Sequence, residues 1–406
     1  MRKLSYAVVP ISVVLAFVLY LITSGGSKSE SEIIEKPAAK VLTRVDSLVL
    51  SYDTLVHQML DSANAVGAAL VITHKGEILH TMLYGVKEDG TRDSIDEHTI
   101  FRLASVSKTI TGVLAGILDS EEQIKLDDRV IDYLPSFRLK DSVNTYDLRI
   151  RHILSHTSGL VPHAYDNLVE AHVPFSTIMD SLFRVNISAE PGVLYGYQNV
   201  MFSLYDTITA IQSGQSFESL LDEKLFRPFG MHDASAGFSA FSNSSNKGLP
   251  HRRSGVGYRP MRLNDRYYLT NPAAGINASI SDMGSFLLAL GRKDPHLLNP
   301  QVADTVLSPQ VISPLRRVYL RHWDRVDSKH YGLGWRIIGY KGRQLGYHGG
   351  YVSGYRAEIA ICREENIGIA FLTNSPGRVG SEIIPRFLDS WFEASDSLKE
   401  IPSDQY

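Results

Sequence analysis

Strand-like segments lie near both ends of this chain, and the residues between them are mostly helical or irregular. In residues 67–85, two apolar runs flank the dipeptide Lys75-Gly76, a pattern typical of a β-hairpin. Further strand-like runs come late, at residues 331–350, 355–365 and 367–375, with turns expected at Lys341-Gly342 and Glu365-Asn366. Two separated groups of strands favour an α+β fold, in which one antiparallel sheet is built from both chain ends and flanked by helices. A mostly helical insert is expected beside the sheet.

The other segments supply the helices. Helical periodicity is clearest in residues 43–65, 216–231, 282–291 and 383–394. With 406 residues, of which 44% are hydrophobic, the chain can bury a large core. We expect one main domain over residues 42–398. Its sheet part covers about 42–100 and 325–398, and its helical part covers about 101–324.

The N-terminus resembles a targeting signal for export. Arg2 and Lys3 precede an apolar run, and a small, polar stretch follows it. We therefore expect residues 1–23 to be either a cleaved signal peptide or an uncleaved membrane anchor. An anchor is possible because residues 4–22 are long enough to span a bilayer. Residues 24–41 are rich in Ser, Glu, Lys and Gly, as polar linkers are. Both alternatives place the main domain outside the cytoplasm, in the periplasm or its equivalent.

Charge and cysteine content narrow the function classes. The formal net charge is −3 and no basic stripe is present, so a nucleic-acid partner is not expected. Cys362 is the only cysteine, which excludes an internal disulfide and a cysteine-rich zinc site. It lies in an apolar, strand-like run and is expected to be a buried thiol. Neither a cofactor nor a metal is expected.

The stretch from Phe101 to Leu118 contains the clearest candidates for catalytic residues. After Ser105 its apolar residues approach the i, i+3, i+4, i+7 spacing of an amphipathic helix. Ser105 is therefore expected at or just inside a helix N-terminus, with Lys108 one turn later on the same face. Backbone N–H groups there favour developing negative charge, and a nearby amine can activate a serine. A plain N-cap role for Ser105 is the alternative, and Ser107 is a second serine beside the lysine.

Two further motifs are weak when taken alone. Tyr197 and Asn199 form a Tyr-x-Asn pattern six residues after Pro191, and Tyr195 is a rival tyrosine. The alternative is a loop with aromatic packing.

The second motif is His348-Gly349-Gly350, in a predicted strand. Glycine weakens a strand unless a ligand or another backbone must come close, so this edge is a candidate for substrate docking. A bulge with a solvent-facing histidine is the alternative.

Together the three motifs resemble, in order and spacing, those of serine hydrolases related to class C β-lactamases and D,D-peptidases. The stretches RHILSHTSGL, LFRPFGM, AAGINASISDMGSFL and YGLGWRI are also similar to that family. The resemblance covers roughly residues 45–395. It implies a β-lactamase/transpeptidase-like fold and a hydrolase that is penicillin-binding-protein-like, of the esterase or D-alanyl-D-alanine carboxypeptidase type.

The resemblance also implies roles for single residues. Ser105 is similar to the acylated nucleophile, Lys108 to its proton partner and Tyr197 to the general base. Free lysine and tyrosine have pKa values of about 10.4 and about 10, so neither is a good base alone near neutral pH. If both are desolvated they can share protons as a coupled pair, and either can then take the Ser105 proton.

The implied substrate-binding residues surround this group. Asn199 resembles the hydrogen-bond partner of both substrate and lysine, and the backbone N–H groups of Ser105 and Tyr351 would form an oxyanion hole. His348, followed by Gly349 and Gly350, stands where β-lactamases usually carry the lysine of a Lys-Thr-Gly motif. A histidine is mostly neutral near pH 7, which suits esters and peptides better than the carboxylate of a β-lactam.

We therefore expect an exported serine hydrolase that forms an acyl-enzyme on Ser105. Its substrate would be a small molecule, a peptide or a cell-wall component with an ester, amide or D-amino-acid linkage. The alternative is a membrane-anchored peptide or cell-wall binding module with little or no turnover. The sequence carries no signal for the oligomeric state, and membrane contact would run through residues 4–22 if they are retained.

Two other enzyme classes fit less well. The sequence has no GxSxG motif, which argues against an α/β-hydrolase. His152 and His156 have the i, i+4 spacing of a zincin motif, but Ile153 stands where the glutamate is needed.

The export address yields the first testable prediction. A C-terminal reporter that works only after export should be active when fused to the full chain. If the mature chain still begins at Met1, residues 4–22 are an anchor rather than a cleaved signal. Activity of a reporter that works only in the cytoplasm would contradict both alternatives.

Overall fold

The structure is a computed structural model that describes residues 44–291, 294–314 and 320–399. The expected address at 1–23 and linker at 24–41 lie outside the described residues. The chain divides into two units, residues 1–45 and 46–406, and the second contains the sheet, the insert and nearly all of the helices. Within the described ranges, the helices are all too short or too polar to span a bilayer.

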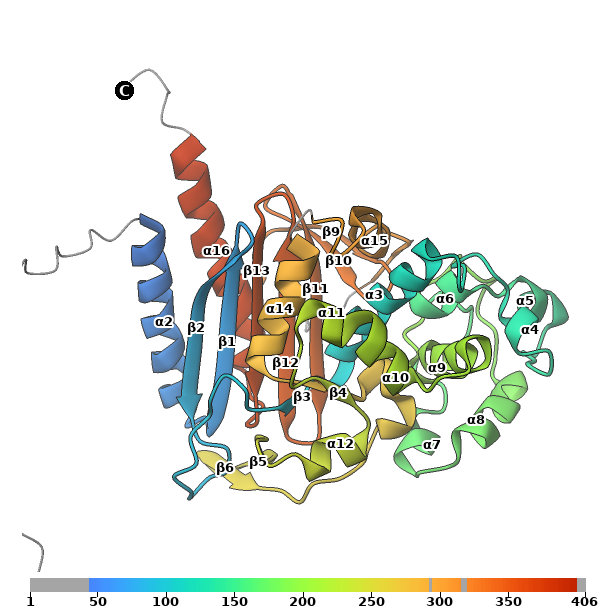
Figure 1. The fold of residues 1–406 in the computed structure, drawn as a ribbon, viewed down its shortest axis with the longest axis horizontal. Coiled ribbons are helices and arrows are strands. Elements are labelled where there is room, and N and C mark those ends of the chain that lie inside the picture. The colour runs from blue at the N-terminus through green and yellow to red at the C-terminus, as the bar shows by residue number, and fades with distance from the viewer. Residues whose placement is uncertain (1–43, 292–293, 315–319, 400–406) are drawn as a thin grey trace, which may run out of the picture. The chain divides into compact units, whose positions relative to one another are not determined.

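One eight-stranded sheet forms the centre of the second unit, with the strand order β2-β1-β13-β12-β11-β10-β9-β8 (Figure 1). Its strands are β1 (Gly67–His74), β2 (Glu77–Gly85), β8 (Val311–Ile312), β9 (Val326–Tyr331), β10 (Arg336–Tyr340), β11 (Arg343–Val352), β12 (Tyr355–Cys362) and β13 (Ile367–Thr373). All neighbours are antiparallel, and β1 pairs with β13 from Ala68↔Thr373 to His74↔Ile367. The prediction of a sheet built from both chain ends is confirmed.

The expected hairpins have the turn chemistry that their dipeptides predict. Lys75 and Gly76 have φ values of +49° and +83°, and Lys341 and Gly342 have +49° and +76°. Positive φ at both central residues is the hallmark of a type I′ turn, whose twist matches that of the flanking strands. These two-residue turns fix the register of β1 on β2 and of β10 on β11.

Helices cover both faces of the sheet (Figure 1). On one face, Val71 of β1 packs near Gly284 of α14 (Ile280–Gly291). On the opposite face, α2 (Arg44–Ser62) and α16 (Gly380–Lys399) are joined by a 2.8 Å hydrogen bond from Tyr52 Oη to Ile383 O. Because strand side chains alternate between faces, His74 contacts Trp391 of α16.

The insert is mostly helical, as expected, but it also contains small strands. A three-stranded sheet has the order β3-β7-β4, and β5 pairs with β6 as a separate hairpin. These strands are β3 (Phe101–Arg102), β4 (Ser235–Ala236), β5 (His251–Ser254), β6 (Gly257–Pro260) and β7 (Ile276–Ala278). Strands of two to four residues give too few positions for a periodicity to be recognised in the sequence.

The helices of the insert are short apart from α3 (Ser107–Ser120), α9 (Asn199–Ser213) and α14. The others are η1 (Ala104–Val106), α4 (Val130–Tyr133), α5 (Ser142–Asp147), α6 (Ile150–Leu154), α7 (Asp166–Glu170), α8 (Phe175–Ser181), η2 (Leu182–Arg184), α10 (Phe217–Leu221), η3 (Asp222–Phe226), α11 (Arg227–Phe229), α12 (Phe238–Asn243), η4 (Tyr268–Thr270), α13 (Asn271–Ala274) and α15 (Pro300–Val306). The predicted helix at 216–231 is the run α10, η3 and α11, and it ends at Gly230, whose φ is +72°.

Helix α3 differs from the amphipathic helix that its pattern predicts, because every residue from Ser107 to Leu118 is buried. The helix lies at the centre of the core rather than on its surface. Its polar side chains are satisfied internally, as in the 2.8 Å bond from Thr111 Oγ1 to Pro272 O. An added Cβ at Gly112 would lie 2.0 Å from Leu333 O, so the turn before β10 packs directly on the helix backbone.

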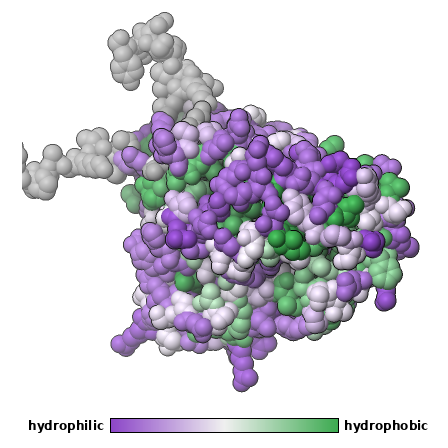
Figure 2. Space-filling view, turned by 45° about the vertical axis from the view of Figure 1, so that its right-hand side comes forward, coloured by the Kyte–Doolittle hydropathy of each residue, from purple (hydrophilic) through white to green (hydrophobic). Residues whose placement is uncertain are grey.

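The surface has no single large apolar region on the face drawn in Figure 2. Hydrophobic residues form several separate groups among hydrophilic ones. Ligand sites are therefore better sought in the cavities than in an apolar patch on this face.

The tight packing of α3 predicts a difference between two glycine variants. Gly112→Ala should lower the free energy of unfolding by about 2 kcal/mol more than Gly116→Ala, measured by urea denaturation. At Gly112 the new methyl group meets backbone, whereas at Gly116 it meets the methyl groups of Val302 and Val306, at 2.8 and 3.0 Å. Both variants gain the same helix propensity, so propensity does not contribute to the difference between their free energies of unfolding. Equal destabilisation would contradict this packing of the helix.

Candidate active site

Ser105 lies in η1, on a sharp turn at the start of the central helix. Ala104 has a φ of +48°, a left-handed conformation that is rare for a residue with a side chain. This turn carries the chain from β3 into α3 and leaves Ser105 partly exposed at a cavity wall. The neighbouring Ser107 is fully buried, and its Oγ accepts a 3.0 Å hydrogen bond from the Ile276 N–H. Ser105 thus faces the cavity, whereas Ser107 ties the start of α3 to β7.

Tyr197 is the tyrosine that reaches the serine. Its Oη donates a 3.1 Å hydrogen bond to Ser105 Oγ. Tyr195 also lines the cavity, but its ring packs against Tyr331 and His156, at centroid distances of 5.4 and 6.0 Å. Burial raises the pKa of Tyr197 to about 12, so its phenol keeps its proton near neutral pH.

Lys108 lies under the same tyrosine and is completely buried. Its Nζ donates hydrogen bonds to Asn199 Oδ1 at 2.8 Å and to Ala273 O at 2.9 Å, and it lies 4.7 Å from the centre of the Tyr197 ring. Burial lowers the pKa of Lys108 well below its usual range. The nearby Asp166 carboxylate opposes this shift, and the Arg336 guanidinium adds to it. Burial therefore favours the neutral forms of both Lys108 and Tyr197.

Asn199 is held by a carboxylate that the sequence patterns did not reveal. Its Nδ2 donates a 3.0 Å hydrogen bond to Asp166 Oδ2, and that oxygen also lies 2.8 Å from His163 Nδ1. Because the amide nitrogen points to Asp166, the amide oxygen of Asn199 must face Lys108. The chain of contacts from His163 through Asp166 and Asn199 therefore fixes the position of the buried lysine.

Strand β11 forms the opposite wall. An added Cβ at Gly350 would lie 2.8 Å from Ser105 N and 2.4 Å from Leu103 O, so the close backbone approach expected at this glycine is present. At Gly349 the same Cβ would lie 2.8 Å from Glu358 Oε2. Tyr351 is 69% exposed and lines the cavity. These contacts bring the strand backbone next to the Ser105 amide, as the proposed oxyanion hole requires.

One edge of this part of β11 is open. The pairing of β10 with β11 stops at Arg336↔Tyr347, whereas β12 continues to pair as far as Val352↔Tyr355. Among the strands that the structure describes, residues 348–352 therefore have a partner on one side only. Such an edge can hydrogen-bond an extended substrate.

His348 is placed differently from the expectation that it binds substrate. It is completely buried and lies behind the cavity wall rather than in it. Its Nδ1 lies 3.0 Å from Gly349 O, which can only accept, so Nε2 accepts the 3.1 Å bond from Tyr331 Oη when the ring is neutral. Burial and then the charges of Arg336 and Lys108 lower the pKa of His348 well below its usual range. These surroundings thus favour the neutral form of the imidazole.

A permanent cation at this cavity is Arg336, which the sequence analysis did not single out. It is the first residue of β10, it lines the cavity of about 680 Å³, and its Cζ lies 5.9 Å from the centre of the Tyr197 ring. It is the cross-strand partner of Tyr347, the residue before His348. The stretch YGLGWRI was recognised as similar to the family, but only the fold shows that its arginine lies at the cavity of the serine.

The two histidines with zincin-like spacing are engaged elsewhere. His152 Nδ1 accepts a hydrogen bond from the Arg149 N–H, and His156 Nδ1 accepts one from the Gln198 N–H. In the part of the chain that the structure describes, no group of three or more His, Cys, Asp or Glu residues is arranged to hold a metal ion. Cys362 is buried, as expected.

Ser105, Tyr197 and the buried Lys108 therefore lie together at one place in the fold. Residues 52–388 match the Beta-lactamase family, a family of serine hydrolases, so the chain belongs to it. The Unguisins hydrolase ungD' of Aspergillus campestris is 24% identical over 341 residues, which are 81% of this chain and 62% of that protein. Penicillin-binding protein 4 of Amycolatopsis lactamdurans is 29% identical over 168 residues, or 41% of this chain and 44% of that protein. The chain thus spans less than two thirds of either relative.

Solved structures show the same fold. The octameric penicillin-binding protein homologue from Pyrococcus abyssi has a TM-score of 0.70 at 20% identity, with 88% of this chain and 79% of that chain covered. A class C β-lactamase mutant has a TM-score of 0.71 at 18% identity, with 86% and 99% covered. The β-lactamase/transpeptidase-like fold that the motifs implied is confirmed.

The distance between Tyr197 and Ser105 predicts unequal effects for two tyrosine variants. Tyr197→Phe deletes only the oxygen that contacts the serine, and it should remove most ester turnover. Tyr195→Phe should lose less than about tenfold, or roughly 1.4 kcal/mol of transition-state stabilisation. Steady-state kinetics of the two purified variants check this. Equal losses would mean that the wrong tyrosine has been assigned.

The charges around Lys108 predict shifts of opposite sign in the pH profile. Asp166→Asn removes a charge that raises the pKa of Lys108, so the rising limb of kcat/KM should move to lower pH. Arg336→Gln removes a charge that lowers this pKa, so the limb should move to higher pH. Shifts in the same direction would show that the pKa of Lys108 does not determine the pH at which kcat/KM rises.

Proposed function

We propose that the protein is an exported serine hydrolase that forms an acyl-enzyme on Ser105 and cleaves an ester, an amide or a D-amino-acid-containing peptide. The observation that carries this proposal is the 3.1 Å contact of Tyr197 Oη with Ser105 Oγ above the desolvated Lys108. Membership of the Beta-lactamase family supports the reaction class, and the name of the relative that hydrolyses unguisins supports turnover rather than binding alone.

The chemistry follows from the neutral state of the pair. Ser105 Oγ attacks the substrate carbonyl carbon, and its proton passes to the unit formed by Lys108 and Tyr197. With Tyr197 protonated, the free lone pair of a neutral Lys108 is the stronger proton acceptor of the two. The N–H groups of Ser105 and Tyr351 stabilise the oxyanion, which such donors do by several kcal/mol. The pair returns the proton to the leaving group, and water then releases the acyl group through the same steps.

The electrostatics of the cavity suggest what the substrate carries near its reacting bond. Arg336 is a permanent cation, whereas His348 is neutral and buried. A carboxylate or another anionic group beside the scissile bond would be attracted to Arg336. This favours peptides with a free C-terminal carboxylate and acidic esters, and it puts the recognition of a β-lactam carboxylate on Arg336 rather than on His348.

Active-site acylation tests the assignment of the nucleophile. A fluorophosphonate should label the wild-type chain at Ser105, as identified by mass spectrometry, and Ser105→Ala should abolish labelling with a loss on the order of 10⁶ in kcat. Ser107→Ala is the matched control: it removes a structural hydrogen bond and should be less stable, but should still be labelled. A panel of esters, D-Ala-D-Ala peptides and a chromogenic cephalosporin then identifies the substrate class. An adduct at any other residue overturns the assignment, and labelling without turnover favours the binding module.

A further inference from the structure

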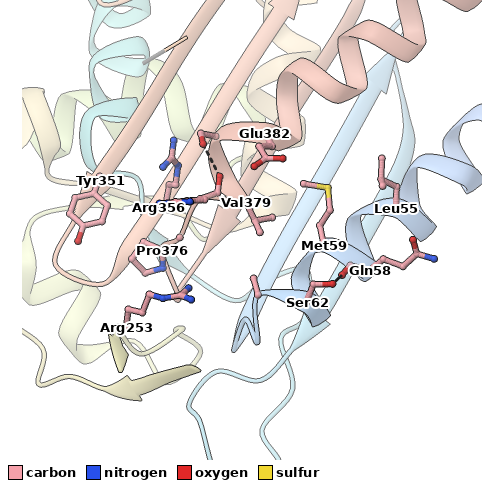
Figure 3. Close-up of a pocket in the computed structure, with 14 residues that line it drawn as sticks. Leu55, Gln58, Met59, Ser62, Arg253, Tyr351, Arg356, Pro376, Val379 and Glu382 are labelled. Atoms are coloured by element: carbon pink, nitrogen blue, oxygen red, sulfur yellow. Dashed lines mark hydrogen bonds between the residues drawn. The ribbon is translucent and has the colours of Figure 1, made fainter. Parts of the chain in front are cut away.

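A second, larger cavity of about 1080 Å³ (Figure 3) shares its lining residue Tyr351 with the cavity at Ser105. Tyr351 and Arg356 form its wall on the sheet, and Leu55, Met59 and Ser62 of α2 face them from the opposite side. The β5–β6 hairpin contributes Arg253 from below in this view, and the loop before α16 contributes Arg378.

Three arginines from separate elements meet at this cavity, in a chain whose net charge is −3. Arg253 and Arg378 are exposed, and neither forms an ion pair with a carboxylate in the part of the chain that the structure describes. Arg356 binds the buried Glu358 through Nε at 2.7 Å. Glu382, which brings a carboxylate to the lining, is already engaged by Arg386 at 2.9 Å. The cavity therefore keeps an excess of positive charge.

The surrounding backbone makes room for these side chains. An added Cβ at Gly380, the first residue of α16, would lie 2.4 Å from Arg356 Cδ. At Gly377 the same atom would lie 2.4 Å from Tyr258 Oη, which donates a 3.3 Å hydrogen bond to Pro376 O. Two glycines thus let α16 and the β5–β6 hairpin pack closely at the wall of the cavity that Arg356 forms.

Tyr351 connects this cavity to the active site, since it lines both. It follows Gly350, which packs on the Ser105 amide, and its cross-strand partner is Arg356. Directly opposed residues in an antiparallel pair have Cα atoms about 4.5–5.5 Å apart and point to the same face. Because side chains alternate along a strand, Tyr351 and Arg356 point to the face opposite to Gly350. A ligand from Ser105 would therefore have to pass over the Tyr351 side chain, which lines both cavities, to reach the arginines.

We propose that this cavity binds a carboxylate or phosphate group at the distal end of an extended substrate whose reacting bond lies at Ser105. Guanidinium groups bind both anions through paired hydrogen bonds, and the two lining arginines without a carboxylate partner among the described residues, Arg253 and Arg378, are available for such a group. This inference rests on the proposed function for the reacting end of the substrate. It makes the protein selective for long, anionic substrates over short or neutral ones.

Matched ester pairs test the proposal. Each pair shares its reacting bond and tether but ends in either a neutral or an anionic group; one series carries the tether on the acyl part and another on the alcohol part. Carboxylate and phosphate ends are compared to identify the preferred anion. Wild type should prefer the anionic member of one series, and Arg253→Gln/Arg378→Gln should reduce that preference at least about tenfold in kcat/KM, mainly through KM.

The control variant is Arg252→Gln/Arg259→Gln, which removes the same charge from exposed positions of the same hairpin outside the cavity. It should leave the preference unchanged. Equal losses in both double variants would reduce the effect to net charge and overturn the proposal, as would a wild type that turns over both esters equally.

A binding measurement keeps this inference separate from the proposed function. Ser105→Ala should bind a fluorescent tethered carboxylate or phosphate, with fluorescence anisotropy that weakens at high salt and in the Arg253→Gln/Arg378→Gln background. Binding without ester turnover by the wild type would support the cavity and contradict the hydrolase. Turnover of neutral esters without any anion binding would support the hydrolase and contradict the anion-binding cavity.

Discussion

The burial of the Lys108 amine is the constraint on which the rest of the site depends. Removing such a group from water costs several kcal/mol unless hydrogen bonds replace the lost hydration. Asn199 and Ala273 supply those bonds, and Asp166 in turn orients Asn199. Because these residues come from α9, α13 and α7, the helical insert must be folded before the lysine can be accommodated. The position of the buried lysine therefore depends on correct packing of the helical insert.

A large part of this arrangement follows from local sequence. The type I′ dipeptides Lys75-Gly76 and Lys341-Gly342 mark their hairpins, and the spacing from Ser105 to Lys108 places both on one helical turn. The resemblance to the family favours Tyr197 over Tyr195, because Pro191-Gly192 lies at the family's usual distance from Tyr197, and the structure places Tyr197 against the serine. Such features depend on a few consecutive residues, which is why they can be recognised without any knowledge of the fold.

Other features depend on contacts between distant segments, and no local pattern reveals them. Arg336 and Asp166 lie 231 and 61 residues from Ser105, yet both act on Lys108. His348 was expected to bind substrate, and it shares a face of β11 with Gly350, which packs on Ser105. Its side chain is nevertheless completely buried behind the cavity wall. The insert also contains short strands whose pairing is fixed only by tertiary packing. The sequence identifies the reacting groups, and the fold identifies the charges that tune them.

The pairing of β1 with β13 delays folding of the central sheet during synthesis of the chain. Ala68 meets Thr373, so 305 residues separate the two partners. At a synthesis rate of about 5–20 residues per second, the first strand waits on the order of 15–60 s for the last. During that time the central sheet lacks its closing partner, and Ser105 has no strand β11 beside it. A nascent chain therefore cannot complete the cavity around Ser105 until β11 has been made.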